Sequence, residues 1–312
     1  MPKKLQVYLF ILTFAIQVNI KAQNYIDLSQ LSYSNTPLNQ FDSTLNKTRV
    51  QDLYFSFSLP YKINEKTALI FGLDFEGMYA ALTPQGNGGS VAGIMLKLGF
   101  NKQLNSKWNL TAVALPRIAS DFKGESGLTA EDFQLGGLAM FKYAKTKQLK
   151  YKIGLYYNSE LFGPFFSIIL GLYYKSENQK LEADISLPSI VDVNYRLKQN
   201  LFVGLKFNAF VRTFNLHDPY YHINGEYLAK TSNEIHSYLG FEPKKGLILR
   251  ANIGHSVGRN YRLYDIQDKV VFGLSVFRFG DDRKQLNSDF ADGVILKLEL
   301  LYRFYTDKKG KK

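Results

Sequence analysis

Apolar and polar residues alternate along most of the chain, from about residue 49 to residue 304. In one segment Leu53, Phe55 and Phe57 alternate with Tyr54 and Ser56. Because successive side chains of a strand point to opposite faces, each such segment has one apolar and one polar surface. The segments run for about ten to fourteen residues, whereas an ordinary strand has ~5–6 and a tilted strand crosses a bilayer with ~9–11. The pattern predicts an all-β fold, an antiparallel up-and-down transmembrane β-barrel.

Sixteen segments carry this pattern to some degree. They lie near residues 24–34, 49–61, 66–80, 89–101, 107–118, 133–144, 148–159, 165–176, 180–187, 190–197, 201–213, 222–230, 233–243, 247–258, 268–279 and 293–304. The weak segments 190–197 and 222–230 can be merged or dropped, which leaves fourteen. We therefore expect about 14 strands, within 12–16, and an even number places both termini on the periplasmic side.

The connections between these segments alternate in length. Short polar turns are expected near 64–66, 144–148, 176–180 and 198–200, and longer loops near 82–90, 120–132, 215–224 and 280–292. Outer-membrane barrels have short turns on one rim and long loops on the other. Aromatic residues lie close to the short turns on the apolar face of their strands, which predicts an aromatic girdle at the membrane interface: Tyr61, Phe100, Trp108, Tyr143, Tyr151, Tyr174 and Tyr195.

The same alternation assigns charged residues to the barrel lumen. The main candidates are Lys97, Arg117, Lys142, Lys152, Arg196, Lys206, Arg212, Arg250, Asp74, Glu76, Glu182, Asp184, Glu234 and Glu299. Further candidates are Lys150, Lys175, Lys297, Arg303, Asp52, Glu160, Asp192 and Glu242. The two signs nearly balance, which leaves two interpretations open: an ion-pair network that fills the interior, or a water-filled channel with charged rings.

The N-terminal segment has the layout of a secretory signal peptide over residues 1–22. Lys3 and Lys4 form its charged start, an apolar run follows, and Ala22 is the expected last residue before cleavage. The barrel would then occupy residues 23–305, and residues 306–312 would form a basic C-terminal tail. These features predict export to the outer membrane of a Gram-negative bacterium.

Composition removes several kinds of chemistry. The chain has no cysteine, so disulfides and thiolate-bound metals are excluded. Its formal net charge of +12 is spread through the alternating pattern without a nucleic-acid-binding module. His217 and His222 share one loop, where an Asp-His or metal site is conceivable, but solvated loop histidines are more common. No catalytic, cofactor-binding or metal-binding residues are predicted.

Several local features resemble a known group of proteins. They are Lys21-Ala22-Gln23 at the end of the signal, the stretch Phe162-Gly163-Pro164-Phe165-Phe166, and Leu187-Pro188 ahead of an aromatic strand. Together with the regular succession of strands and turns, they make the chain resemble an uncharacterised Bacteroidota outer-membrane β-barrel protein of a domain-of-unknown-function family. Such barrels usually end on an aromatic residue; Phe304 fits, but a tail follows it.

The leading functional hypothesis is a small passive, porin-like channel or a structural barrel without catalytic activity. Its expected partners are outer-membrane lipid, lipopolysaccharide and, during insertion, the barrel-assembly machinery; no nucleic acid is expected. The alternative is a barrel enzyme of the lipase or protease type, or a transporter of hydrophobic molecules. A third hypothesis is a secreted β-sandwich, whose aromatic residues would be buried between two sheets.

Overall fold

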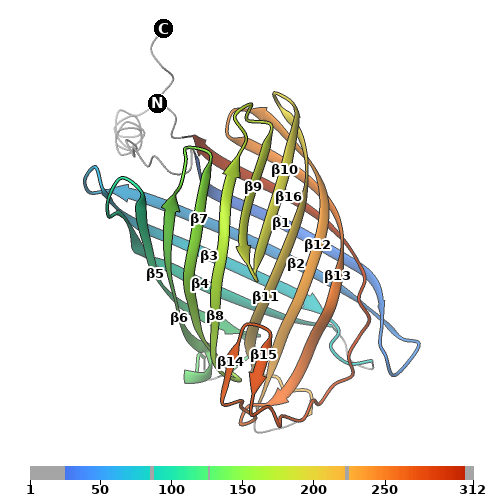
Figure 1. Ribbon diagram of the computed structural model, residues 1–312. Coiled ribbons are helices and arrows are strands. Elements are labelled where there is room, and N and C mark those ends of the chain that lie inside the picture. The colour runs from blue at the N-terminus through green and yellow to red at the C-terminus, as the bar shows by residue number, and fades with distance from the viewer. Residues whose placement is uncertain (1–24, 85–87, 126, 222–224, 306–312) are drawn as a thin grey trace, which may run out of the picture.

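The strands of the chain close into a single antiparallel barrel (Figure 1). The computed structural model describes residues 25–84, 88–125, 127–221 and 225–305. In these ranges fourteen strands form the wall, and β1 pairs with β16 to close it. The wall strands are β1 (Tyr25–Gln40), β2 (Lys47–Lys62), β3 (Thr67–Ala80), β4 (Gly89–Gln103), β5 (Trp108–Ser120), β6 (Phe133–Ala144), β7 (Leu149–Glu160), β8 (Gly163–Lys175), β9 (Leu181–Leu187), β10 (Ile190–Lys198), β11 (Leu201–Leu216), β12 (Glu226–Lys244), β13 (Leu247–Asp265) and β16 (Val294–Tyr305). The predicted fold class and strand number are confirmed.

The number fourteen arises differently from the sequence prediction. The weak segment 190–197 is a genuine wall strand, β10. The expected strands 222–230 and 233–243 are parts of one long strand, β12, in the residues that are described. The expected strand 268–279 is wrong, because that segment folds into a small hairpin of β14 (Phe272–Leu274) and β15 (Phe277–Phe279) outside the closed ring.

The two ends of the barrel differ in their connections. We call the end that carries Tyr25 and Tyr305 the short-turn end; its turns are 63–66, 104–107, 145–148, 176–180, 199–200 and 245–246. The opposite, long-loop end has the connections 41–46, 81–88, 121–132, 217–225 and 266–293, with a 3₁₀ turn at Ala130–Asp132. Two short connections, 161–162 and 188–189, interrupt this pattern.

The outer surface of the wall is apolar because one face of every long strand carries aliphatic or aromatic side chains. Leu53, Phe55 and Phe57 on β2 are exposed, as are Leu296 and Leu298 on β16. Lipid is the environment in which a continuous apolar belt on a closed barrel is stable, because neighbouring wall strands pair their backbone groups along most of their length. Among the described residues, no helix has the length and apolar character to cross a membrane.

The residues predicted to form an aromatic girdle lie near the short-turn end. Tyr61, Phe100, Trp108, Tyr151 and Tyr195 are exposed, whereas Tyr143 and Tyr174 are partly buried. The rings of Trp108 and Tyr143 lie with their centroids 5.0 Å apart across β5 and β6. Their position at a membrane interface stays a prediction.

One part of the wall is built from short strands. β9 has 7 residues and β10 has 9, and β8 pairs with β9 only from Leu170 to Lys175. Nearer the long-loop end, β8 instead pairs in parallel with β14, at Phe165 with Gly273 and Phe166 with Leu274. The β14–β15 hairpin therefore lies against the part of β8 that β9 does not reach (Figure 1).

Candidate functional site: a lumen with three zones

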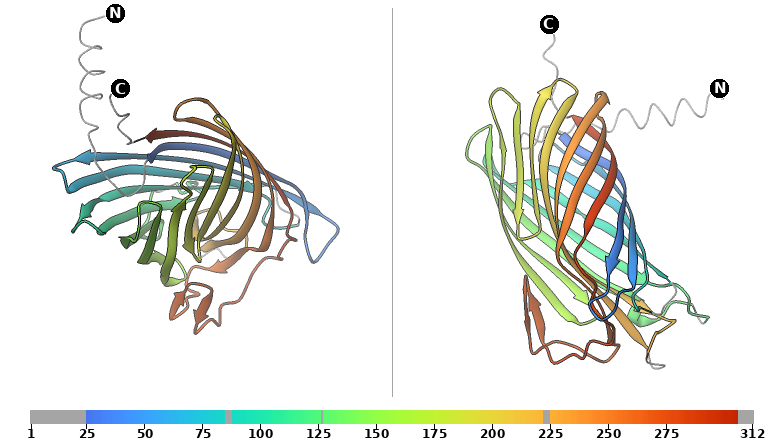
Figure 2. Two further views of the ribbon diagram at one scale, coloured as in Figure 1. Left: turned by 45° about the horizontal axis from the view of Figure 1, so that its top comes forward. Right: turned by 90° about the vertical axis from the view of Figure 1, so that its right-hand side faces the viewer.

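The long-loop end of the lumen is filled by buried apolar side chains. We call this group the long-loop cluster: Phe41, Val50, Met78, Ala80, Leu82, Val91, Ala119, Phe214, Leu216, Leu228, Tyr261, Leu263 and Phe290. It forms because β11 leans across the barrel at this end, where Asn215 pairs with Ser120 of β5, a strand that is not its wall neighbour. Figure 2 shows the barrel from two further sides, with its strands strongly tilted. The cluster closes this end of the lumen with apolar contacts.

Ion pairs line the middle of the lumen. Lys97 Nζ lies 2.6 Å from Asp74 Oδ1, and Arg117 Nη2 lies 2.6 Å from Glu76 Oε1. Arg117 also donates to the carbonyl oxygen of Thr213 on β11, at 3.0 Å. Because β5 and β11 lie on different sides of the ring, this arginine ties two distant parts of the wall together.

A second group of charges lies between β10, β11, β12, β13 and β16. Lys206 pairs with Glu299 at 2.9 Å, and Arg250 pairs with Asp192 at 3.0 Å. The ring of Tyr238 packs over Gly204, its cross-strand partner, at a position where a Cβ atom would clash. The ring therefore occupies the space that the absent Gly204 side chain leaves. The middle of the lumen is thus occupied by paired charges and rings.

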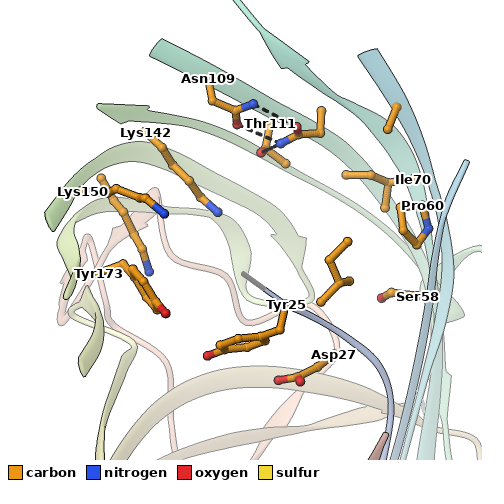
Figure 3. Close-up of a pocket in the computed structure, with 14 residues that line it drawn as sticks. Tyr25, Asp27, Ser58, Pro60, Ile70, Asn109, Thr111, Lys142, Lys150 and Tyr173 are labelled. Atoms are coloured by element: carbon orange, nitrogen blue, oxygen red, sulfur yellow. Dashed lines mark hydrogen bonds between the residues drawn. The ribbon is translucent and has the colours of Figure 1, made fainter. Parts of the chain in front are cut away.

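The short-turn end contains a cavity of about 360 Å³, which we call the chamber (Figure 3). Its wall is lined by Tyr25, Ile26, Asp27, Ser58, Pro60, Ala68, Ile70, Asn101, Asn109, Thr111, Lys142, Lys150, Lys152 and Tyr173. Asn101 and Asn109 satisfy each other through two hydrogen bonds of 2.9 Å. Such a volume lies within the range of about 300–1,000 Å³ that is typical of small-molecule sites.

The charges around the chamber do not balance. Asp27 is neutralised by Arg303, which contacts both carboxylate oxygens at 2.6 and 3.0 Å. Lys152 pairs with Asp184. Within the described ranges, Lys142 and Lys150 have no ion-pair partner; Lys150, 4% exposed, lies over the ring of Tyr173 at 5.1 Å. Two ammonium groups on the chamber wall therefore lack a contacting carboxylate.

The structure places the predicted lumen residues inside the barrel wall, since none of them is exposed. Thirteen of the fourteen main candidates make an ion pair with another described residue, and Lys142 is the exception. Sequence reasoning missed Asp27 on β1 and Lys230 on β12, which pairs with Asp52. Both lie inside the weak segments 24–34 and 222–230. Lys230 fits the alternation of β12, whereas a β-bulge between Asp27 and Ser29 reverses the faces along β1, so alternation alone does not predict the direction of Asp27. Their roles in solute passage stay a prediction.

The loop histidine is not an isolated, solvated side chain. His217 Nε2 lies 3.0 Å from both carboxylate oxygens of Asp132, which also accepts hydrogen bonds from the Thr129 amide and from Asn215. Burial acts to raise the pKa of Asp132, but these hydrogen bonds outweigh it and lower the pKa below its ordinary value. This cluster ties the 121–132 connection to the end of β11, and His222 lies outside the described residues.

No group of three or more His, Asp or Glu side chains in the described part of the chain could hold a metal ion. Searches of curated proteins give no match to the chain.

Several solved structures resemble the barrel in shape. The COG4313 outer membrane channel from Pseudomonas putida F1 is 8% identical, with a TM-score of 0.46 over 93% of this chain and 98% of that one. The P. putida toluene transporter TodX is 10% identical, with a TM-score of 0.39 over 90% and 91% of the two chains. The NanC porin is 7% identical, with a TM-score of 0.34 over 88% and 98%. The barrel assignment rests on the strand pairing itself.

A family model covers most of the sequence. It is described as "Domain of unknown function (DUF6268)" and matches residues 14–279, from the predicted signal segment through to β15. The chain belongs to this family.

Proposed function

We propose that this protein is a non-catalytic channel of a bacterial outer membrane, closed at its long-loop end in the conformation described here. The apolar belt supports a wall embedded in lipid. The short-turn end would face the periplasm, because β1 begins and β16 ends at that rim and short turns occupy the periplasmic rim of such barrels.

The observation that carries this proposal is the chamber. A barrel that served only as a structural element would gain stability from filling its lumen with well-packed or fully paired groups. The long-loop cluster and the ion pairs in the middle of the lumen fill it in this way. The short-turn end instead keeps about 360 Å³ of space and two lysines without carboxylate partners in the described structure. Like charges that lie side by side on neighbouring strands without a carboxylate between them destabilise a sheet, which favours a role for the chamber beyond holding the barrel together.

A structural barrel is the second candidate, and the closure at the long-loop end favours it. The rings of Phe41 and Phe290 pack edge to face at 5.7 Å, and Phe214 is 1% exposed. A channel requires these contacts to separate, whereas a structural barrel requires them to persist.

Conductance of the purified, folded barrel in a planar bilayer separates the two candidates. The channel predicts discrete current steps whose size rises with salt concentration. Silence both from the wild type and from a Phe214→Ala variant, whose long-loop closure is weakened, would refute the channel and leave the structural barrel, provided that heat-modifiable gel mobility shows both to be folded.

A further inference from the structure

The chamber has the features of a ligand site rather than of a void left by imperfect packing. Its polar and apolar groups are segregated: ammonium groups stand on one side, and apolar side chains such as Pro60 and Ile70 stand on another (Figure 3). A void between packed side chains carries no such arrangement, and it tends to be small and apolar. The arrangement fits a solute with a charged end and an apolar body.

The three lysines lie together because of strand register. Lys142 on β6 is the direct cross-strand partner of Lys152 on β7, and Lys150 lies two residues away from Lys152 on the same face. Like charges that face each other across two strands destabilise a sheet. Asp184 contacts Lys152 and acts on Lys142 only from beyond ion-pair distance. An anion between the lysines would remove this repulsion.

Lys150 is the most informative of the three side chains. It lies on the chamber wall, the residue as a whole is 4% exposed, and among the described residues its one close side-chain partner is the face of the Tyr173 ring. A lysine ammonium has three donors, and this one opens onto the chamber. An acceptor group on a solute in the chamber can therefore pair with it.

The rest of the wall limits what that acceptor can be. Tyr25 donates its hydroxyl to Glu182 at 2.5 Å, so its ring, and not its polar atom, is offered to the chamber. Arg303 is paired with Asp27, so the chamber has no unpaired arginine on that side. Ile26, Pro60 and Ile70 add aliphatic surface. A fully polar anion such as phosphate would lose hydration against these groups, whereas a flat apolar body would bury surface on them.

We propose that the chamber binds a small organic monocarboxylate with an apolar body, whose carboxylate accepts hydrogen bonds from Lys142 and Lys150 and whose body packs on the rings of Tyr25 and Tyr173. A carboxylate has two oxygens and can accept from both ammonium groups at once. The inference deepens the proposed function by naming the class of solute, and it rests on that function only for the route by which the solute arrives.

Equilibrium binding tests the site without requiring conduction. Sodium benzoate is titrated calorimetrically into the folded, detergent-solubilised barrel, beside benzyl alcohol and inorganic phosphate as probes that lack the charge or the apolar body. Saturable benzoate binding is expected, with benzyl alcohol and phosphate each weaker by about tenfold or more. Equal binding of benzyl alcohol would overturn the anionic part of the proposal, and equal binding of phosphate would overturn the apolar part.

Two variants locate the binding. Lys142→Met and Lys150→Met should each weaken benzoate by about tenfold to a hundredfold, the effect of losing one hydrogen bond to a charged group. The matched control is Lys206→Met, the same change at a lumen lysine that pairs with Glu299 away from the chamber; its benzoate affinity should stay within about twofold. Benzoate affinity that is unchanged in the Lys142→Met, Lys150→Met double variant would overturn the site.

The binding measurement and the bilayer measurement test the ligand site and the channel independently. Benzoate binding by a barrel that never conducts would uphold the site and refute the channel. Conductance without saturable benzoate binding would uphold the channel and refute the site.

Discussion

The two ends of the lumen are built from the same alternating strands but are filled in opposite ways. At the long-loop end, inward positions carry apolar side chains such as Phe214 and Leu263, which pack together and exclude water. At the short-turn end, inward positions carry Lys142 and Lys150 around a cavity. Alternation decides which side of the wall a residue faces, whereas the composition along the barrel axis decides whether the lumen is sealed or open.

The ion pairs in the middle of the lumen lie between these two regions. Removing one of their buried members should lower the free energy of unfolding more than any other substitution considered below. Arg117 is 3% exposed and binds Glu76, Gln134 and the Thr213 carbonyl. Arg117→Ala leaves the Glu76 carboxylate with Arg212, at 3.6 Å, as its remaining ion-pair partner among the residues that the structure describes. We expect a loss of about 3–5 kcal/mol in the free energy of unfolding, measured by urea titration in lipid vesicles.

The control for this variant is Arg262→Ala. Arg262 pairs with Asp289 at 2.7 Å, but its side chain is 36% exposed. Its loss should cost less than about 1 kcal/mol. Equal losses for the two arginines would show that the lumen network does not hold the barrel.

The closure of the long-loop end can be weakened by one substitution. Phe214→Ala removes a ring that is 1% exposed and that also lies under the Arg117 guanidinium, at 4.8 Å. The cavity it leaves should lower the free energy of unfolding by about 3 kcal/mol. If this end is the closed one, the same variant should conduct more often than the wild type in a planar bilayer. Unchanged open probability despite the stability loss would mean that the block lies elsewhere.

Asp132 fastens the 121–132 connection over the same end. Asp132→Asn removes a buried charge that accepts hydrogen bonds from three residues, so a loss of about 2 kcal/mol is expected. Because the folded pKa lies below the ordinary value, the contribution is complete above about pH 4 and is lost as the pH falls through the folded pKa. Urea titrations at several pH values should show the wild type and the variant converging only in acid. Convergence near pH 7 would contradict this account.

Removing a charge from the chamber should raise the free energy of unfolding, whereas the substitutions above lower it. Lys150→Met replaces an ammonium that lacks a carboxylate partner among the described residues by an apolar side chain of similar length. The barrel should become more stable by about 1 kcal/mol, since the repulsion from Lys142 and Lys152 disappears. Destabilisation in the same urea assay would show that the interaction of Lys150 with Tyr173 outweighs that cost.

The sequence predicted the features that depend on alternation and little beyond them. Lys97 and Asp74 could be placed in the lumen because the alternation assigns a residue to one face of the wall as soon as its strand is known. The contact between Asp52 and Lys230 could not be predicted, since the two residues are 178 positions apart and meet only through the tilt and stagger of the closed barrel. The chamber has the same origin, because it depends on where the lysines of β6 and β7 fall relative to β1, β2 and β3.

The segment 268–279 shows why alternation alone can mislead. It contains Phe272, Leu274 and Phe277, and it reads as a strand. Ser275, however, has a φ of 52°, which turns the chain after three paired residues. Period-two patterning reports an extended backbone but not its partner, so a hairpin that packs on β8 and a wall strand look alike in sequence.

Access to the lumen from each side tests the central claim most directly. The chain has no cysteine, so one introduced thiol reports one position. Ser58→Cys lies on the chamber wall and Ala119→Cys lies in the long-loop cluster, where Ala119 is 0% exposed. With a membrane-impermeant thiol reagent, we expect Ser58→Cys to react when the reagent is on the periplasmic side and to stay unmodified in intact cells. Ala119→Cys should stay unmodified from both sides. Rapid modification of either thiol in intact cells would contradict a lumen that is closed at its long-loop end.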